Sequence, residues 1–269
     1  MLAARALLAG LSIARLLLGA DTEARRFAPS YASSTVVHAA SQQSGTFAPN
    51  TIVTLYGRQL AYVTRAIGAA DVRDGLMPTV LSGTGVKVLI DNVPAPIYFV
   101  SPGQVNFLLP VGLKEGVRKL HLSLDGIAGP VVEFRLAASA PGLFLRQPGQ
   151  ALAVRLDGTL AGSENPARPG DTLILFATGL GQTEGAPPRA GEVAKAAAAL
   201  LAIDGFAVKL NDRPLPRDHI YYAGLAPGFA GLYQINLRVP DDAPADPEIR
   251  LVTMDAESPV AVRLPLRPK

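Results

Sequence analysis

The sequence contains no cysteine, and this absence limits the chemistry available to it. Without a thiol the chain forms no disulfide, binds no metal through thiolates and has no cysteine nucleophile. Export stays compatible with this composition, because an oxidising compartment permits disulfides without requiring them.

Charge is also scarce, at 17% of 269 residues, which argues against several long polar helices. The 26 glycines and 23 prolines instead predict many turns between short apolar runs. Such punctuation is typical of an all-β sandwich or barrel. The length suits two domains of roughly 100–150 residues, each with enough apolar material for a core.

The net charge of +3 falls largely on the start of the chain, because Arg5 and Arg15 both lie within residues 1–20. The remainder has 23 basic and 22 acidic side chains and no basic stripe. Recognition of phosphate backbones needs such a stripe, so we expect no nucleic-acid partner.

Residues 1–20 have the pattern of a secretory signal peptide. The alternatives are an N-terminal core helix and a wrongly assigned start codon. Arg5 provides the positive start, residues 6–14 the apolar stretch and Gly19 with Ala20 a small-residue cleavage site. The run is too short to span a bilayer of about 30 Å. We therefore expect an extracytoplasmic protein (secreted, periplasmic or at the cell surface) without a transmembrane anchor. A flexible lead-in follows over residues 21–35.

The rest of the chain uses one module twice, over residues 36–140 and 141–269. Its signature, PAPIYFVSPGQVNFLLP at residues 94–110, returns as PRDHIYYAGLAPGFAGLYQINLRVP at residues 216–240. Three polar or proline positions repeat with a constant shift of 130 residues: Gln104, Asn106 and Pro110 return as Gln234, Asn236 and Pro240.

Alternating runs predict the strands of each module. Val105, Phe107 and Leu109 share one face of a strand whose other face carries Gln104 and Asn106. About seven such strands per module, with turns roughly every 8–12 residues, predict two tandem immunoglobulin-like β-sandwiches. Residues 192–201, EVAKAAAALL, have helix propensity and predict either a short helical insertion or an extended apolar connector.

Six motifs follow one another along the chain: VVHAAS, FAPNTIVTLYGRQLA, PAPIYFVSPGQVNFLLP, APGLF, NPARPGDTLILFATGLG and YYAGLAPGFAGLYQINLRVP. In this order they resemble a family abundant in acidobacteria, the Solibacter uncharacterised C-terminal domain. The resemblance covers residues 36–266 and implies an exported, immunoglobulin-like module without established catalytic residues. Two positions depart from the family pattern, with Asn50 in place of glycine and His38 in place of asparagine.

Reaction chemistry is hard to find in the sequence. His38, His121 and His219 lack metal-ligand spacing, and the G-x-S-x-G pattern of serine hydrolases is absent. The acidic residues 241–246 match no calcium loop and predict a solvated turn. We therefore predict no catalytic, cofactor-binding or metal-binding residue, no cofactor and no enzymatic activity.

The repeated amides and the aromatic residues are the remaining candidates. The amides have two possible roles: they bind a ligand (a sugar or a peptide), or they satisfy backbone groups of nearby turns. This applies to Gln104 with Asn106 and to Gln234 with Asn236. We favour the structural role, because duplication fits a requirement of the fold. The apolar insertion at residues 224–231 predicts a contact surface, directed toward a partner or toward the first module; its candidate residues are Tyr221, Tyr222, Leu225 and Phe229.

Three functions follow, in decreasing order of support. The first is a non-catalytic module pair for protein interaction, adhesion or scaffolding, whose partner is a protein or a cell-envelope component. The second is a carbohydrate-binding module that uses aromatics and amides as its platform. The third is a hydrolase with dispersed carboxylates about 5–10 Å apart, a spacing that a sequence does not reveal.

Overall fold

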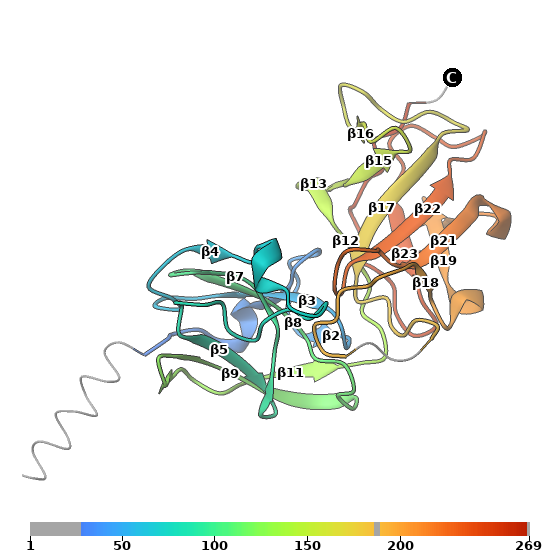
Figure 1. Cartoon of the computed structure of the whole chain (residues 1–269). Helices are drawn as coiled ribbons and strands as arrows, with labels where there is room; N and C mark the ends of the chain where they lie inside the picture. Colours follow the sequence, from blue (N-terminus) through green and yellow to red (C-terminus); the bar gives the residue numbers. More distant parts are fainter. Residues whose placement is uncertain (1–27, 186–188, 268–269) are drawn as a thin grey trace, which may run out of the picture.

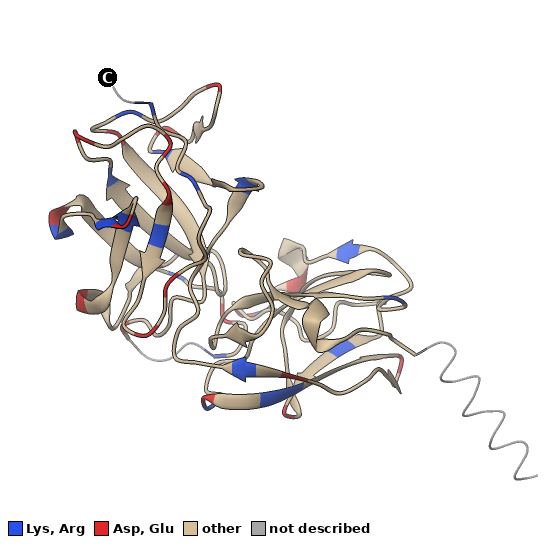
Figure 2. Cartoon of the chain, turned by 180° about the vertical axis from the view of Figure 1, so that it is seen from behind, with Lys and Arg blue, Asp and Glu red and all other residues tan. Residues whose placement is uncertain are grey.

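The structure, a computed structural model, describes residues 28–185 and 189–267. The predicted signal peptide at residues 1–20 lies outside these residues. Two β-sandwich modules follow one another along the chain (Figure 1). Lys and Arg are interspersed with Asp and Glu over both modules (Figure 2).

The first module consists of two sheets packed face to face. In chain order its main strands are A to G of a constant-type immunoglobulin sandwich, because the sheets have the orders A-B-E-D and G-F-C. The first sheet contains β1 (Val36–His38), β3 (Ile52–Tyr56), β8 (Gln104–Leu108), β7 (Ile97–Ser101) and β4 (Arg65–Ala66). The second contains β2 (Thr46–Phe47), β11 (Val132–Leu136), β9 (Gly116–Leu124), β5 (Val86–Ile90) and β6 (Val93–Pro94), with β10 (Ile127–Ala128) beside β9.

The second module repeats this plan. Its first sheet contains β16 (Leu160–Ala161), β15 (Ala153–Arg155), β17 (Thr172–Thr178), β22 (Tyr233–Arg238), β21 (Ile220–Leu225) and β18 (Ala198–Ala199), with β12 (Gly142–Leu143) beside β17. Its second contains β20 (Arg213–Pro214), β19 (Ala207–Leu210) and β23 (Ile249–Val252), and β13 (Leu145–Gln147) with β14 (Gln150–Ala151) forms a separate hairpin. The short 3-10 helices are η1 (Ser33–Thr35), η2 (Ala69–Asp71), η3 (Ile203–Gly205) and η4 (Arg217–His219).

Strand registers show how closely the modules correspond. Ile52 pairs with Leu108 across β3 and β8, and Thr172 pairs with Arg238 across β17 and β22, at shifts of 120 and 130 residues. The parallel contact between β2 and β11 also returns, as a bridge from Ala167 to Leu266. The predicted all-β chain of two tandem immunoglobulin-like sandwiches is therefore confirmed.

Each module has its own apolar core between its sheets. The alternating residues Val105 and Phe107 are fully buried in the first, and Ile235 and Leu237 in the second. This alternation places the amides on the opposite, outer face of each strand, because side chains change sides at every residue.

Two segments differ from simple sequence expectations. Residues 192–201 form no helix, so the helical alternative is wrong: Ala198 and Ala199 form β18, paired with β21. The edge of β21 supplies backbone partners that outweigh the local helix propensity. Within the predicted lead-in, Tyr31 packs on the first module, where its hydroxyl donates to Pro130 O at 2.7 Å and accepts from Leu122 N at 2.6 Å.

Within residues 28–185 and 189–267, none of the helices has the length and apolar character needed to cross a membrane.

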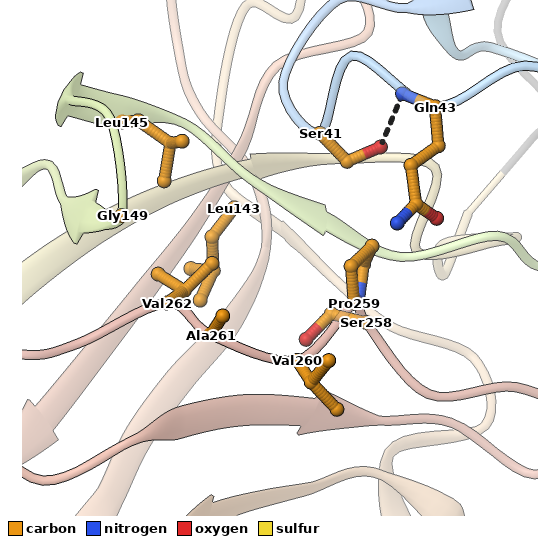
Figure 3. A pocket seen from close by; sticks show the side chains of 10 residues that line it. All are labelled: Ser41, Gln43, Leu143, Leu145, Gly149, Ser258, Pro259, Val260, Ala261 and Val262. Carbon is orange, nitrogen blue, oxygen red and sulfur yellow. Dashed lines mark hydrogen bonds between the residues drawn. The ribbon is translucent and has the colours of Figure 1, made fainter.

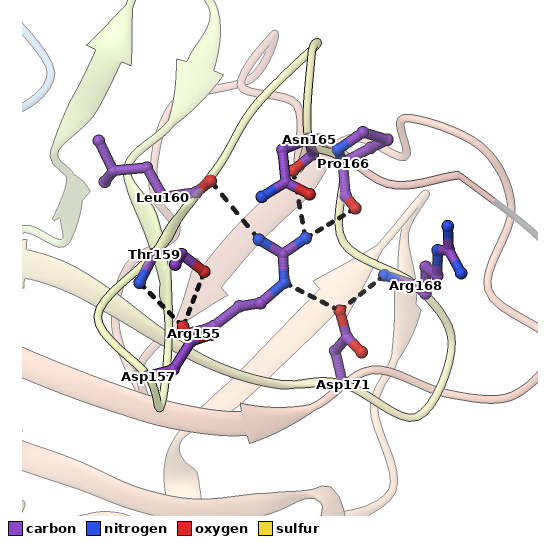
Figure 4. A network of polar contacts seen from close by, with 8 residues as sticks. All are labelled: Arg155, Asp157, Thr159, Leu160, Asn165, Pro166, Arg168 and Asp171. Carbon is purple, nitrogen blue, oxygen red and sulfur yellow. Dashed lines mark hydrogen bonds and ion pairs between the residues drawn. The ribbon is translucent and has the colours of Figure 1, made fainter.

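A polar network fixes the loop that follows β15 (Figure 4). The Arg155 guanidinium donates to Asp171 at 3.3 Å, to Pro166 O at 2.7 Å and to Asn165 O at 3.2 Å. The same Asp171 oxygen accepts from Arg168 N at 3.0 Å. One side chain thus ties three separate stretches of the second module together.

We expect Arg155→Met to lower the free energy of unfolding by about 2 kcal/mol, because carbonyls and a carboxylate lose a charged donor. The control is Arg213→Met, whose ion pair with Asp242 is 77% and 63% exposed and is worth less than about 1 kcal/mol. Calorimetric unfolding of both variants checks this difference. Equal losses of stability would contradict the role of the network.

Candidate functional site

The modules are joined by a buried junction in which one hydroxyl serves both sides. The fully buried Thr178 accepts a hydrogen bond from Ile52 N at 3.0 Å and donates to Gly231 O at 2.7 Å. The Tyr98 hydroxyl of the first module donates to Ala230 O of the second. These contacts connect strands of the first module directly to the loop between β21 and β22.

A second set of backbone contacts joins long loops of the two modules. Met77 N donates to Gly191 O at 2.9 Å, and Val193 N donates to Gly75 O at 2.8 Å. A small apolar cluster fills the space beside them, formed by Met77, Leu108 and Ala230 with Ile52, Ile67, Tyr98 and Val193 packed against it. The modules therefore share buried apolar contacts as well as hydrogen bonds.

Gly231 allows the closest approach of the two modules. A Cβ at this position would lie 2.2 Å from Leu108 Cδ1 and 2.7 Å from Asn50 O. Its φ of +67° also favours glycine. Nearby, the buried Tyr233 hydroxyl donates to Gly181 O at 2.5 Å, and burial raises the pKa of Tyr233 to about 12.

His38 occupies the centre of the same junction. Its Nε2 lies 3.1 Å from Ala140 O, and its Nδ1 accepts from Ala40 N at 3.2 Å and from Ser41 N at 3.3 Å. These partners select the neutral tautomer with the proton on Nε2. Burial lowers the pKa of His38 to about 4, opposed by the hydrogen bond to Ala140.

The predicted contact residues separate into exposed and buried positions. Tyr221 and Phe229 are exposed, at 56% and 52%, whereas Leu225 lies in the core of the second module. The Tyr222 hydroxyl donates to Leu225 O at 2.7 Å and accepts from Ala198 N at 3.0 Å. The predicted loop contacts the first module through Ala230 and Gly231, so the structure does not gather the four residues into one surface.

The repeated amides occupy equivalent places on the outer faces of the two A-B-E-D sheets. Gln104 Nε2 donates to Asn106 Oδ1 at 2.8 Å, and Gln234 Nε2 donates to Asn236 Oδ1 at 2.8 Å. All four side chains are half-buried. The amides of each pair thus bond to one another, where the sequence predicted bonds to neighbouring turns.

Aromatic rings flank each amide pair. In the first module Tyr56 is the cross-strand neighbour of Gln104, and Phe99 that of Asn106. In the second, Phe176 and Tyr222 are the corresponding neighbours of the two amides. The two rings of each set lie on opposite sides of the central strand, so each pair is bracketed by aromatics.

A pocket of about 280 Å³ lies beside the junction (Figure 3). Ser41 and Gln43 line it from the first module, and Leu143, Leu145 and residues 258–262 line it from the second module. Its lining contains no ionisable side chain, and its volume lies just below the roughly 300–1,000 Å³ of small-molecule sites. The pocket therefore offers a surface for packing but no acid, base or charged group for a reaction.

The three histidines contact different parts of the structure and share no site. His38 is in the junction, His121 lies on β9, and His219 Nδ1 lies 3.2 Å from Arg238 O. Within the described ranges, no group of three His, Cys, Asp or Glu residues could hold a metal ion.

Comparisons with known proteins assign the chain to no family. No protein-family model and no curated protein matches the chain. The family resemblance of the motifs therefore stays a prediction.

Several solved structures are distantly similar to this chain. One is SGBP-B of the Bacteroides ovatus mixed-linkage glucan utilization locus, solved with a mixed-linkage heptasaccharide, at 9% identity and a TM-score of 0.34. The alignment covers 90% of this chain but only 45% of that protein. Domains 5–6 of the S-layer protein SbsC align over 90% of this chain and 99% of theirs, at 8% identity and a TM-score of 0.28. The tandem Ig repeats of Dlar align over 90% and 96%, at 10% identity and a TM-score of 0.21. Similarities this distant carry no information about a ligand.

The sequence predicted a contact surface on the loop at residues 224–231, directed toward a partner or toward the first module, but it did not predict the individual partners at the junction. Thr178 meets partners 126 and 53 residues away, and His38 meets one 102 residues away. No local pattern encodes such distances. The one sequence signal at position 38 was a histidine where the motif that the chain resembles has asparagine.

Stability should fall in mild acid because of His38. Its folded-state pKa of about 4 lies below the 6.5 of an unfolded histidine, so the unfolded state binds the proton more tightly. The stabilising effect is present above about pH 6.5 and is lost as the pH falls toward 4. The free energy of unfolding should drop by about 2 kcal/mol between pH 7 and pH 5 from this group.

Denaturant unfolding at several pH values measures this loss. His38→Gln keeps an acceptor toward Ala40 and a donor toward Ala140 and should flatten the profile. His219→Gln, which replaces a half-buried histidine of η4 outside the junction, is the matched variant whose profile is compared with that of His38→Gln. A wild-type-like profile in His38→Gln would contradict the assignment.

Proposed function

We propose that the chain is a non-catalytic, two-module unit for protein interaction, adhesion or scaffolding outside the cytoplasm. The carrying observation is the junction, in which Thr178, Tyr98 and the loop at residues 226–231 tie the modules together. A rigid pair of this kind presents surfaces of two modules at a constant angle. Its partner is a protein or a component of the cell envelope.

Burial and bonding at the junction support rigidity. Interfaces between domains of one chain normally permit relative motion unless they are large and apolar. Here backbone groups of both modules pair directly, and the buried glycine contact leaves little room for sliding. A fixed angle suits assembly and adhesion, because less conformational entropy is lost on binding.

The two modules should tumble as one body in solution. Nitrogen-15 relaxation of the purified protein should give a single rotational correlation time for both modules. Gly231→Ala should separate the two values, because its Cβ would clash with Leu108 and Asn50.

Gly228→Ala provides a matched control in the same loop. It also changes a glycine of positive φ, but no atom lies within 4 Å of the added Cβ. This variant should keep one correlation time. Separate values in the wild-type protein would refute the rigid pair, and turnover of a chromogenic hydrolase substrate by the purified chain would refute the non-catalytic assignment.

Carbohydrate binding is the second candidate, and the bracketed amide pairs favour it. Aromatic rings stack on sugar rings, and amides bond hydroxyl groups. Both kinds of side chain meet on the same outer face in each module.

A further inference from the structure

Each amide pair retains an acceptor atom and a donor atom that take no part in its internal hydrogen bond. Gln104 Nε2 donates to Asn106 Oδ1, which leaves Gln104 Oε1 and Asn106 Nδ2 outside this bond, and the same holds for Gln234 and Asn236. Among residues 28–185 and 189–267, the only buried side-chain polar atom without a partner is Arg118 Nε. The remaining amide atoms therefore reach solvent.

Two of the four bracketing rings, those of Tyr56 and Tyr222, are held in position by hydrogen bonds within the protein. The Tyr56 hydroxyl donates to Gln42 Oε1 at 3.0 Å, and Tyr56 is 38% exposed. The Tyr222 hydroxyl is bonded to Leu225 O and Ala198 N. Rings and amides fixed before binding lose little conformational entropy when a ligand arrives.

The strands that carry the amides exclude one mode of recognition. A peptide that binds by strand addition needs a free sheet edge. Strand β8 is paired on both sides, by β3 and β7, and β22 likewise by β17 and β21. Ligands at these faces must be recognised through side chains alone.

The chemistry of the faces matches a polyhydroxylated, uncharged ligand. A sugar hydroxyl both donates and accepts, so two neighbouring hydroxyls can satisfy the Gln Oε1 and the Asn Nδ2 together. The apolar face of a sugar ring stacks on an aromatic ring. The amide pairs carry no charge to balance an acidic group.

We propose that the two outer faces are equivalent subsites for a neutral glycan, one in each module. Gln104 and Asn106 bind hydroxyls in the first subsite, flanked by Tyr56 and Phe99. In the second, Gln234 and Asn236 do so, flanked by Phe176 and Tyr222. This inference rests on the carbohydrate-binding candidate above and adds the position, the number and the chemistry of its sites.

Titration calorimetry with four neutral hexasaccharides tests the proposal: cellohexaose, xylohexaose, mannohexaose and maltohexaose. With at least one of them the wild-type protein should bind two ligands per chain. Gln104→Ala and Gln234→Ala should each reduce this number to one, and the double variant should abolish binding. Tyr56→Ala should weaken the first subsite roughly tenfold.

Controls separate binding from folding. Gln147→Ala removes an exposed amide on β13 and should leave two sites intact. If an alanine variant unfolds, Gln104→Met and Gln234→Met keep the side-chain volume while removing the acceptor, and they should give the same loss of a site.

Several outcomes would overturn the proposal. These are binding that the amide variants leave unchanged, a single site that responds to only one module, and no heat with any of the four sugars. The rigid unit is tested separately by relaxation, so a blank titration with one correlation time refutes the glycan subsites alone.

Discussion

The close approach of the Gly231 backbone to Asn50 and Leu108 is the contact on which the arrangement of the whole chain depends. It brings the loop between β21 and β22 against the start of β3 and the end of β8, where Ile52 and Leu108 lie. Thr178 then bridges both modules within hydrogen-bonding distance, and Tyr98 closes over Ala230. Burial of His38 in the same junction couples its protonation to the stability of this contact.

The duplicated modules diverge where the junction forms. Ile52 and Leu108 of the first module correspond to Thr172 and Arg238 of the second, which replace apolar contacts with polar ones. Arg238 pairs with Asp241 at 3.0 Å on this second surface. The same plan thus yields an apolar docking surface in the first module and a polar surface at the equivalent place in the second.

The outer sheet faces have diverged less than the junction. The amide contact has the same length in both modules, and an aromatic ring flanks each amide pair on either side. A requirement of the fold explains a bond between neighbouring amides, although the sequence favoured bonds from the amides to backbone groups of nearby turns. The flanking rings are a separate feature of these faces: Tyr56 is exposed, whereas Phe99, Phe176 and Tyr222 are half-buried.

The sequence by itself determined the repeat, the alternation of buried and outer residues and the tandem sandwich. These features depend on spacing within about ten residues, such as Val105 and Phe107 against Gln104 and Asn106. Only the tertiary structure decided which side chains meet across the modules. Thr178 with Ile52, His38 with Ala140 and Gly231 with Leu108 are far apart in the chain, and their contacts depend on how two finished sandwiches pack. It also decided against a helix at residues 192–201, since the pairing of β18 with the edge of β21 exists only once that sheet has formed.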